Sequence, residues 1–250
     1  MSLIYGINAV SEALKTRRIS KIMHERGAGP RVDALIARAY ELRLAVETLD
    51  RRALDKVSRG GVHQGVAAEL EPLAAYTIEE LVGEAIGPAL LVVLDGIEDP
   101  QNVGAILRSV DAVGAHGVIR QARHAAPLDG ATAKASAGAV SHVRIATVVN
   151  IARAIEELKE LNVWTIGLDS DAADTHDSVD YTVPTAFVLG AEGTGLRRLV
   201  RETCDRLVSI PMAGNVNSLN VSVSAGIALF EAARQRRAAG MAPGGSPVQD

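Results

Sequence analysis

The sequence predicts an α/β protein made of a small amino-terminal unit and a larger unit built on a parallel sheet. Hydrophobic residues make up 48% of the 250 residues but aromatic residues only 3%, so the core must consist of Ala, Val, Leu and Ile. Short aliphatic runs alternate with helical patterns, and 23 glycines are available for the turns between them. Strands separated by helices are typical of a mostly parallel sheet covered on both faces.

The first 70 residues predict a small α/β unit. Apolar side chains recur at helical spacing over residues 31–42, which indicates an amphipathic helix. Asn8 and Asp50 are predicted to cap two further helices, which end near Leu14 and Val57. The strands predicted for this unit are residues 4–5, 21–24, 45–49 and 66–70.

The pattern breaks near residues 71–76, after which Thr77 and Glu80 have the spacing of a capping box. Asn150 is predicted to cap a later helix. The strands predicted beyond the break are residues 89–94, 117–119, 143–146, 163–168, 185–189 and 207–210, and the helices are residues 102–113, 132–135, 150–161, 195–204 and 220–237. These assignments predict a first domain over 1–72, a linker with a short helix over 73–86, a second domain over 87–239 and a disordered tail over 240–250.

Charge is distributed unevenly along the chain. Residues 1–70 carry 12 Lys and Arg against 8 Asp and Glu, whereas residues 71–250 carry 14 against 22. The net charge of −4 argues mildly against a nucleic-acid binder, because phosphate contacts need Lys and Arg. A basic first unit on an acidic remainder suggests two units with different partners, although random variation in surface charge explains the same pattern equally well.

The cysteine count, the histidine spacing and the hydropathy of the first residues bear on disulfides, metal binding and membrane association. The single cysteine, Cys204, excludes an internal disulfide, favours a reducing cytoplasm and is expected to be an inert core thiol. The first 18 residues contain no apolar stretch long enough for a signal peptide or a membrane span, so no membrane association is expected. The six histidines lack metal-ligand spacing, so no metal site is expected.

Three segments that leave predicted strands carry polar residues, and ligands of parallel sheets gather beyond the carboxyl ends of strands. The first, LDGIEDPQNVGAILRS, places Asn102 at the mouth of a helix and Arg108 on a different helical face, six residues later. The second, FVLGAEGTGL, sets Glu192 among three glycines that permit a tight turn. Its G-x-x-G-x-G spacing differs from the dinucleotide-binding and P-loop fingerprints.

The third segment, IPMAGNVNSLNVSVSA, leaves a predicted strand and enters the last helix. Ser218 and Asn220 belong to a cluster of short polar residues at the start of this helix, where they can cap it or hold a ligand. Taken alone, each segment has a structural explanation about as good as a functional one. These explanations are a helix cap with a surface arginine for the first, an anion at a helix start for the second and helix capping for the third.

In this order, the three segments resemble the signature motifs of the SpoU (TrmH) family, the knotted SPOUT class of RNA methyltransferases. YGINAV, from Tyr5, and HQGV, from His63, resemble the RNA-binding domain of ribosomal-protein-L30e type that precedes the catalytic domain in many members. The resemblance spans nearly the whole chain. It implies an L30e-like α/β domain followed by a parallel-sheet SPOUT domain with a carboxyl-terminal trefoil knot. It also implies a homodimer.

The resemblance implies transfer of a methyl group from S-adenosyl-L-methionine to a ribose 2'-hydroxyl of a structured RNA. The implied catalytic and positioning residues are Arg108, Asn102, Glu192, Ser218 and Asn220, and the implied cofactor contacts are Gly190, Ile210, Leu219, Leu189, Met212 and Asn220. Arg108 matches the arginine that the family places at the reacting ribose. Because a guanidinium is a poor proton acceptor at neutral pH, we expect Arg108 to grip the adjacent phosphate and stabilise developing negative charge.

The choice of RNA is a separate question. Length and motif sequences are most similar to members that methylate a guanosine of 23S ribosomal RNA. A transfer-RNA guanosine, or the ribosomal site whose methylation gives thiostrepton resistance, is an alternative substrate. A ribosome-assembly factor that binds RNA without catalysis is the alternative from another class, and the joint presence of Arg108, Glu192 and Asn220 favours the enzyme. The missing glycine fingerprints argue against a nucleotide-dependent dehydrogenase or kinase.

Overall fold

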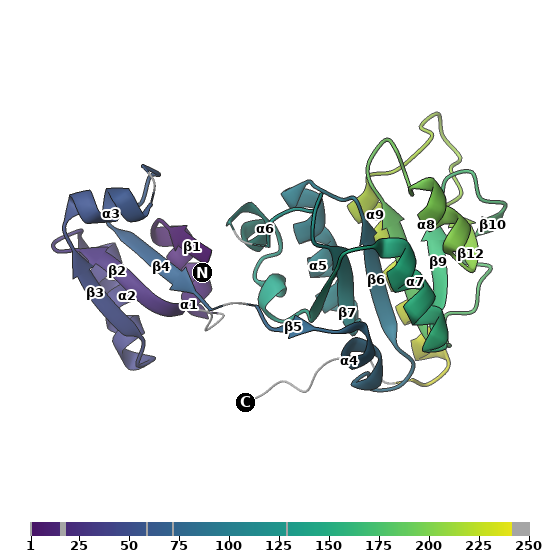
Figure 1. The fold of residues 1–250 in the computed structure, drawn as a ribbon, viewed down its shortest axis with the longest axis horizontal. Helices are drawn as coiled ribbons and strands as arrows, with labels where there is room; N and C mark the ends of the chain where they lie inside the picture. Colours follow the sequence, from purple (N-terminus) through teal and green to yellow (C-terminus); the bar gives the residue numbers. More distant parts are fainter. Residues whose placement is uncertain (1, 16–18, 59, 72, 129, 242–250) are drawn as a thin grey trace. The chain divides into compact units, whose positions relative to one another are not determined.

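The computed structural model describes residues 2–15, 19–58, 60–71, 73–128 and 130–241 (Figure 1). Two compact units divide between residues 73 and 74, and residues 128–134 group with the first unit. Within the described residues, no helix combines the length and the apolar character needed to cross a membrane. Residues 242–250 of the segment predicted to be disordered lie outside the described residues.

The first unit is a mixed sheet in the order β1-β4-β2-β3, accompanied by helices α1, α2 and α3. Strand β4 runs antiparallel to β1 and β2, whereas β2 and β3 are parallel. Apolar side chains of α1 and α2 pack with those of β1, β2 and β4 in one buried cluster. The bounds are β1 Ser2–Tyr5, α1 Ile7–Lys15, β2 Ile19–Glu25, α2 Pro30–Glu41, β3 Ala45–Leu49, α3 Arg51–Val57 and β4 Val66–Leu70.

Of two helix caps predicted for this unit, one is present in the structure and one is not. The Asp50 cap is confirmed, since its carboxylate accepts a hydrogen bond from the Ala53 amide at 2.8 Å. The predicted Asn8 cap is wrong, because α1 already begins at Ile7. Gly6 turns the chain there with a φ of 92°, and the Ile7 amide donates to the Gln64 side-chain oxygen at 3.0 Å, so no cap at Asn8 is needed.

The second unit confirms the predicted parallel sheet. Every strand pairing described for its sheet is parallel, in the order β10-β12-β9-β11-β6-β7-β8-β5. The strands are β5 Ala75–Tyr76, β6 Leu90–Asp95, β7 Gly117–Gln121, β8 Ile145–Val148, β9 Trp164–Leu168, β10 Asp174–Thr175, β11 Thr185–Gly190 and β12 Arg206–Ser209. The short strands β5 and β10 lie at the two sheet edges and were not predicted, since two residues carry no periodic signal.

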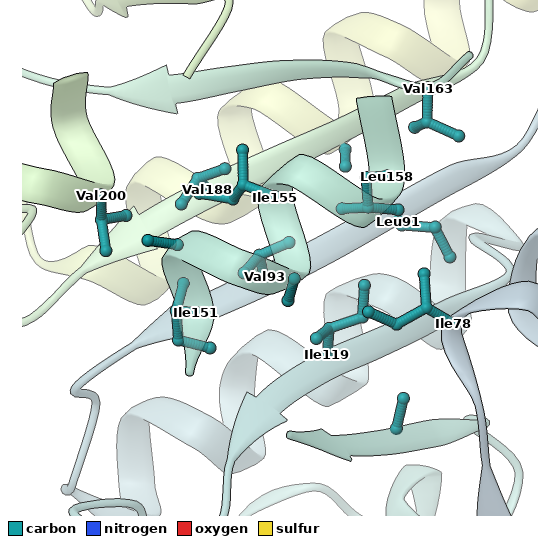
Figure 2. Close-up of a cluster of buried hydrophobic side chains, with 14 of the residues drawn as sticks. Ile78, Leu91, Val93, Ile119, Ile151, Ile155, Leu158, Val163, Val188 and Val200 are labelled. Atoms are coloured by element: carbon teal, nitrogen blue, oxygen red, sulfur yellow. The ribbon is translucent and has the colours of Figure 1, made fainter. Parts of the chain in front are cut away.

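Helices cover both faces of this sheet (Figure 1). On one face, α4, α7 and α8 pack on alternate residues of β6, β7 and β11, and Figure 2 shows the buried cluster that they form. On the other face, α5 packs against α9. The helices are α4 Ile78–Gly83, α5 Pro100–Val113, α7 Ile151–Glu160, α8 Arg198–Thr203 and α9 Val221–Ala238, with a short 3₁₀ helix over Ala139–Ser141. Helix α6, Gly130–Ala135, lies almost wholly in the segment that groups with the first unit.

Helix termini in the second unit are partly as predicted. The capping box at Thr77 and the cap at Asn150 are confirmed. Helix α5 begins at Pro100 with Asp99 as its cap, so Asn102 lies inside the first turn and is not the cap. Helix α8 begins at Arg198, three residues later than predicted, because Gly195 has a φ of 65° and Arg197 is extended.

Candidate active site

Three chain segments meet at the side chain of Asn220, which is the residue before α9. Its amide nitrogen donates to the Asn102 side-chain oxygen at 2.9 Å and to the Glu192 carboxylate at 2.5 Å. Asn102 comes from α5, after β6, and Glu192 from the loop after β11. The structure therefore joins one polar residue from each of the three segments that the sequence singled out.

The orientation of the Asn220 amide follows from its position at a helix start. Its side-chain oxygen accepts from the Ser222 amide at 2.8 Å and from the Val223 amide at 3.4 Å, which satisfies two otherwise unpaired helix donors. The nitrogen must then point away from the helix, toward acceptors. Both of its hydrogens are used, one for each of Asn102 and Glu192. Asn220 is thus a helix cap and also the link between two other loops.

The loop that carries Glu192 is folded tightly on itself. The Gly195 amide donates to the Ala191 carbonyl at 2.9 Å, and Gly193 and Gly195 have φ values of 76° and 65°. A Cβ on Gly190 would lie 2.1 Å from the Gly195 carbonyl carbon, so no other residue fits there without moving the loop. The glycines therefore serve close backbone approach, as the sequence predicted.

The segment between β12 and α9 exposes its backbone. Pro211 to Ser218 are exposed, whereas Ile210 and Leu219 at the two ends are half-buried. Within the described part of the chain, no backbone group of residues 212–219 has a hydrogen-bond partner. Peptide donors and acceptors in this segment are thus available to a ligand, between two partly buried apolar side chains.

Not every predicted site residue joins the cluster. Arg108 is exposed on α5, and among the described residues its side chain has no hydrogen bond or ion pair. Ser218 is likewise exposed, and within the described residues no hydrogen bond links it to the cluster. Among the predicted cofactor contacts, Leu189 is 1% exposed and Met212 36% exposed, so they differ greatly in accessibility.

Sequence reasoning missed a second polar group at this edge of the sheet. Asp95, the last residue of β6, is buried and accepts hydrogen bonds from Arg197 through the backbone amide at 2.9 Å and through Nε at 2.6 Å. Arg197 also donates through Nη2 to the Gln121 side-chain oxygen at 2.9 Å, at the end of β7. The signal present in the sequence was a carboxylate that ends the otherwise apolar run LLVVLD.

The Cys204 thiol donates to the Val200 carbonyl at 3.2 Å and not to a residue of this cluster. Burial raises the pKa of the Cys204 thiol to about 12, as expected for an unreactive thiol. Within the described residues, no three His, Cys, Asp or Glu side chains are grouped as a metal site would require. The cluster therefore offers amide, carboxylate and backbone groups, which link the three segments and are suited to hydrogen bonds with a polar ligand.

Comparison with known proteins identifies two matching regions. Residues 89–230 match the profile described as "SpoU rRNA Methylase family", and residues 3–76 match "RNA 2'-O ribose methyltransferase substrate binding". The first match contains Asn102, Arg108, Glu192 and Asn220. More than half of the chain is thus covered by one family profile, and most of the remainder by the other.

Individual relatives match over nearly the full length. The 23S rRNA (guanosine-2'-O-)-methyltransferase RlmB of Pseudomonas syringae pv. tomato is 43% identical over 94% of this chain and 96% of that protein. The putative TrmH family tRNA/rRNA methyltransferase YacO of Bacillus subtilis is 40% identical over 95% and 97%. The SpoU methyltransferase AviRb of Streptomyces viridochromogenes, solved with the cofactor AdoMet, superposes with a TM-score of 0.75 at 27% identity, over 94% of this chain and 90% of that chain.

Proposed function

The chain belongs to the SpoU rRNA methylase family, and from that membership we propose that it methylates the ribose 2'-oxygen of a guanosine in 23S ribosomal RNA. It is an S-adenosylmethionine-dependent RNA 2'-O-methyltransferase. The observation that supports the substrate most strongly is the 43% identity to a 23S rRNA methyltransferase across both units of the chain.

The loops around Asn220 fit the cofactor S-adenosylmethionine. Gly190 leaves no room for a side chain where the loop after β11 turns, and residues 212–219 leave peptide groups unpaired within the described structure. Half-buried Ile210 and Leu219 offer apolar contact, and Leu189 supports the glycine loop from the core. We assign the cofactor to Gly190, Ile210, Leu219, Leu189, Met212 and Asn220. When bound, it supplies the electrophilic methyl group.

Arg108 is assigned to the RNA substrate. It is exposed and without a partner among the described residues, so its guanidinium is free to form paired hydrogen bonds with a phosphate. In that position its positive charge stabilises negative charge that develops on the ribose oxygen. A guanidinium is a poor proton acceptor at neutral pH, so Arg108 is not assigned as the base.

The other motif residues are assigned to positioning. Asn102, Asn220 and Glu192 hold the first turn of α5, the start of α9 and the loop after β11 in fixed relation through two hydrogen bonds. Fixed geometry is a major source of rate enhancement when two reactants must meet in line. Ser218 lies two residues before Asn220, on the exposed segment, where its hydroxyl is available to substrate or cofactor.

The first domain is assigned to RNA binding. Residues 3–76 match a substrate-binding profile, and residues 1–70 carry the positive charge balance that phosphate contacts require. We retain 1–72 as the RNA-binding domain, 73–86 as the linker with its short helix, and 87–239 as the catalytic domain. The acidic balance of the remainder makes the first domain the main RNA anchor.

Helix α9 supports a homodimer. Val223 and Phe230, seven residues apart on one helical face, are 48% and 52% exposed, an arrangement suited to a second copy of the chain.

We also propose the trefoil knot of the family. Strand β12 pairs with β9 and β10, whereas Asn220, at the start of α9, contacts Asn102 after β6 and Glu192 after β11, so the connecting segment passes the carboxyl end of β9. We place the protein in the cytoplasm, with ribosomal RNA.

Methyl transfer to different RNAs tests the substrate. Purified protein is incubated with labelled S-adenosylmethionine and, separately, unmodified 23S ribosomal RNA, bulk transfer RNA and no RNA. We expect label in 23S RNA only, at one nucleotide. Label in transfer RNA alone would retain the reaction and replace the substrate. Label in neither RNA, with no cofactor binding, would favour an RNA-binding assembly factor.

A further inference from the structure

The carboxylate of Asp95 is fully buried, with 0% of its side chain exposed, and its hydrogen-bond and ion-pair partners are atoms of Arg197. The Arg197 backbone amide reaches one carboxylate oxygen at 2.9 Å and Nε reaches the other at 2.6 Å. Nη2 also forms an ion pair with Asp95 and donates to the Gln121 oxygen at 2.9 Å. Asp95 and Gln121 end the neighbouring strands β6 and β7.

Both ends of the loop over residues 190–197, called the glycine loop below, are attached to Asp95. In the pairing of β11 with β6, Gly190 lies opposite Asp95, so the loop begins beside its backbone. Seven residues later, Arg197 ends the loop on the Asp95 side chain. The middle of the loop is held separately, by the hydrogen bond from Asn220 to Glu192. The loop is therefore fixed at its start, its middle and its end.

We infer that Asp95, Arg197 and Gln121 are positioning residues that hold the loop over residues 190–197 in the form that binds the cofactor. This inference rests on the proposed function, in which Gly190 contacts S-adenosylmethionine. No contact of these three residues with substrate is required. Their effect is exerted through the loop, whose ordering is completed before the ligand arrives.

The chemistry of the group explains why an arginine occupies this position. A buried carboxylate is unfavourable unless it is paired and hydrogen-bonded. The planar guanidinium reaches one oxygen of Asp95 through Nε and Nη2 and the amide oxygen of Gln121 through Nη2, while the Arg197 backbone amide bonds the other carboxylate oxygen. A lysine has no such fork. The Arg197 side chain itself is 57% exposed, so its removal opens no cavity in the core. Among the described residues, the Asp95 carboxylate then keeps only the Arg197 backbone amide as a hydrogen-bond donor.

A neighbouring arginine supplies a matched control. Arg198 is 87% exposed and pairs with Glu202 at 3.4 Å, one turn along α8, and within the described residues its side chain forms no hydrogen bond or ion pair with Asp95 or Gln121. Cofactor affinity is measured by calorimetry with S-adenosylmethionine on the full-length wild type, Arg197→Ala, Arg197→Lys, Asp95→Asn, Gln121→Ala and Arg198→Ala. Steady-state methyl transfer to RNA gives KM for the cofactor and kcat for the same proteins.

We expect Arg197→Ala to weaken cofactor binding and raise KM by about 10-fold or more, as for loss of hydrogen bonds to a charged group. We expect kcat at saturating cofactor to stay within about 3-fold, because the residue touches no reacting atom. Arg197→Lys and Gln121→Ala are expected to lie between wild type and Arg197→Ala, and Arg198→Ala to match wild type. Asp95→Asn is expected to weaken binding as Arg197→Ala does.

The outcomes separate this inference from the proposed function. Suppose that the wild type binds S-adenosylmethionine and transfers its methyl group, and that Arg197→Ala binds the cofactor as tightly as Arg198→Ala does. That result overturns the positioning role and leaves the proposed function standing. A fall in kcat with unchanged KM also overturns the positioning role. Wild type that binds no S-adenosylmethionine overturns the proposed function itself. If Asp95→Asn does not fold, the exposed Arg197 variants still decide the question.

Discussion

The side-chain nitrogen of Asn220 lies 2.9 Å from the side-chain oxygen of Asn102, although 118 residues separate them in sequence. The same nitrogen contacts Glu192 at 2.5 Å, and the Asn220 oxygen caps α9. One amide thus carries two separable roles, helix capping through its oxygen and loop positioning through its nitrogen. This separation makes the positioning role testable.

Asn220→Asp keeps the capping oxygen but removes both donors and places a second carboxylate beside Glu192. Because Asp caps helices as well as Asn does, we expect thermal stability to fall by less than about 1 kcal/mol. We expect methyl transfer to fall by about 10-fold or more, since hydrogen bonds to a charged group are lost. Both kcat/KM for methyl transfer and the thermal unfolding midpoint are measured for the wild type and for Asn220→Asp. Full activity in Asn220→Asp would show that the contacts to Asn102 and Glu192 are dispensable.

Arg108→Lys tests the proposed phosphate grip. A lysine keeps the charge but cannot form the paired hydrogen bonds of a guanidinium, so we expect clearly reduced kcat/KM, and a larger loss in Arg108→Ala. Because Arg108 is exposed, both variants are expected to unfold within about 0.5 kcal/mol of wild type. Arg153, exposed on α7, serves as the control for an arginine-to-lysine change. Near-normal activity of Arg108→Lys would count against a bidentate grip.

His116 is expected to make the second unit sensitive to mild acid. Its Nδ1 accepts from the Leu90 amide at 2.9 Å, and burial, followed by the nearby charge of Arg236, lowers its pKa. A lowered pKa means that the unfolded chain takes up the proton first. The contribution of His116 is complete above about pH 6.5 and is lost as pH falls toward the folded-state pKa, with a slope of at most about 1.4 kcal/mol per pH unit.

The measurement is the urea unfolding free energy of wild type and His116→Gln, compared between about pH 7.5 and about pH 5, on either side of the histidine titration. We expect the wild type to lose more stability over this interval than the variant, in which this titration is absent. Equal pH dependence of the two proteins would show that His116 keeps its unfolded-state pKa.

Arg236 is expected to be among the most sensitive positions for stability. Its guanidinium is buried and donates to four backbone carbonyls, those of Tyr181, Pro88, Ala89 and Val183, at 2.6 to 3.0 Å. Arg236→Ala removes all four hydrogen bonds and leaves the Tyr181 and Pro88 carbonyls without a donor among the described residues, whereas Ala89 and Val183 still accept from Thr185. We therefore expect a loss of about 3 kcal/mol or more in unfolding free energy. Arg237→Ala, exposed and adjacent, is the control and is expected to change stability by less than about 0.5 kcal/mol. Equal losses of unfolding free energy in the two variants would show that the hydrogen bonds of Arg236 to the four carbonyls do not stabilise the fold.

Local signals accounted for much of the secondary structure. The caps at Asp50, Thr77 and Asn150 were predicted correctly because each depends on a side chain and a backbone amide three residues away. The start of α8 was not, because Arg197 is kept out of the helix by Asp95, 102 residues earlier. The edge strands β5 and β10 likewise form only because β8 and β12 lie beside them.

The site was predictable as a set of residues but not as an arrangement. The motif resemblance selected Asn102, Glu192 and Asn220, and their meeting point depends on how loops far apart in sequence converge. The partnership of Asp95 with Arg197 was missed, since a carboxylate at the end of a strand is ordinarily a solvated loop residue and only the fold buries it.

Nucleoside analysis of 23S ribosomal RNA tests the central claim most directly. Unmodified 23S RNA is incubated with the protein and S-adenosylmethionine, digested to nucleosides and examined by mass spectrometry, with Arg108→Ala in parallel. We predict one new 2'-O-methylguanosine per RNA with wild type and a strongly reduced amount with Arg108→Ala. A methyl group on a base instead of a ribose, or equal product from both proteins, would contradict the proposed function.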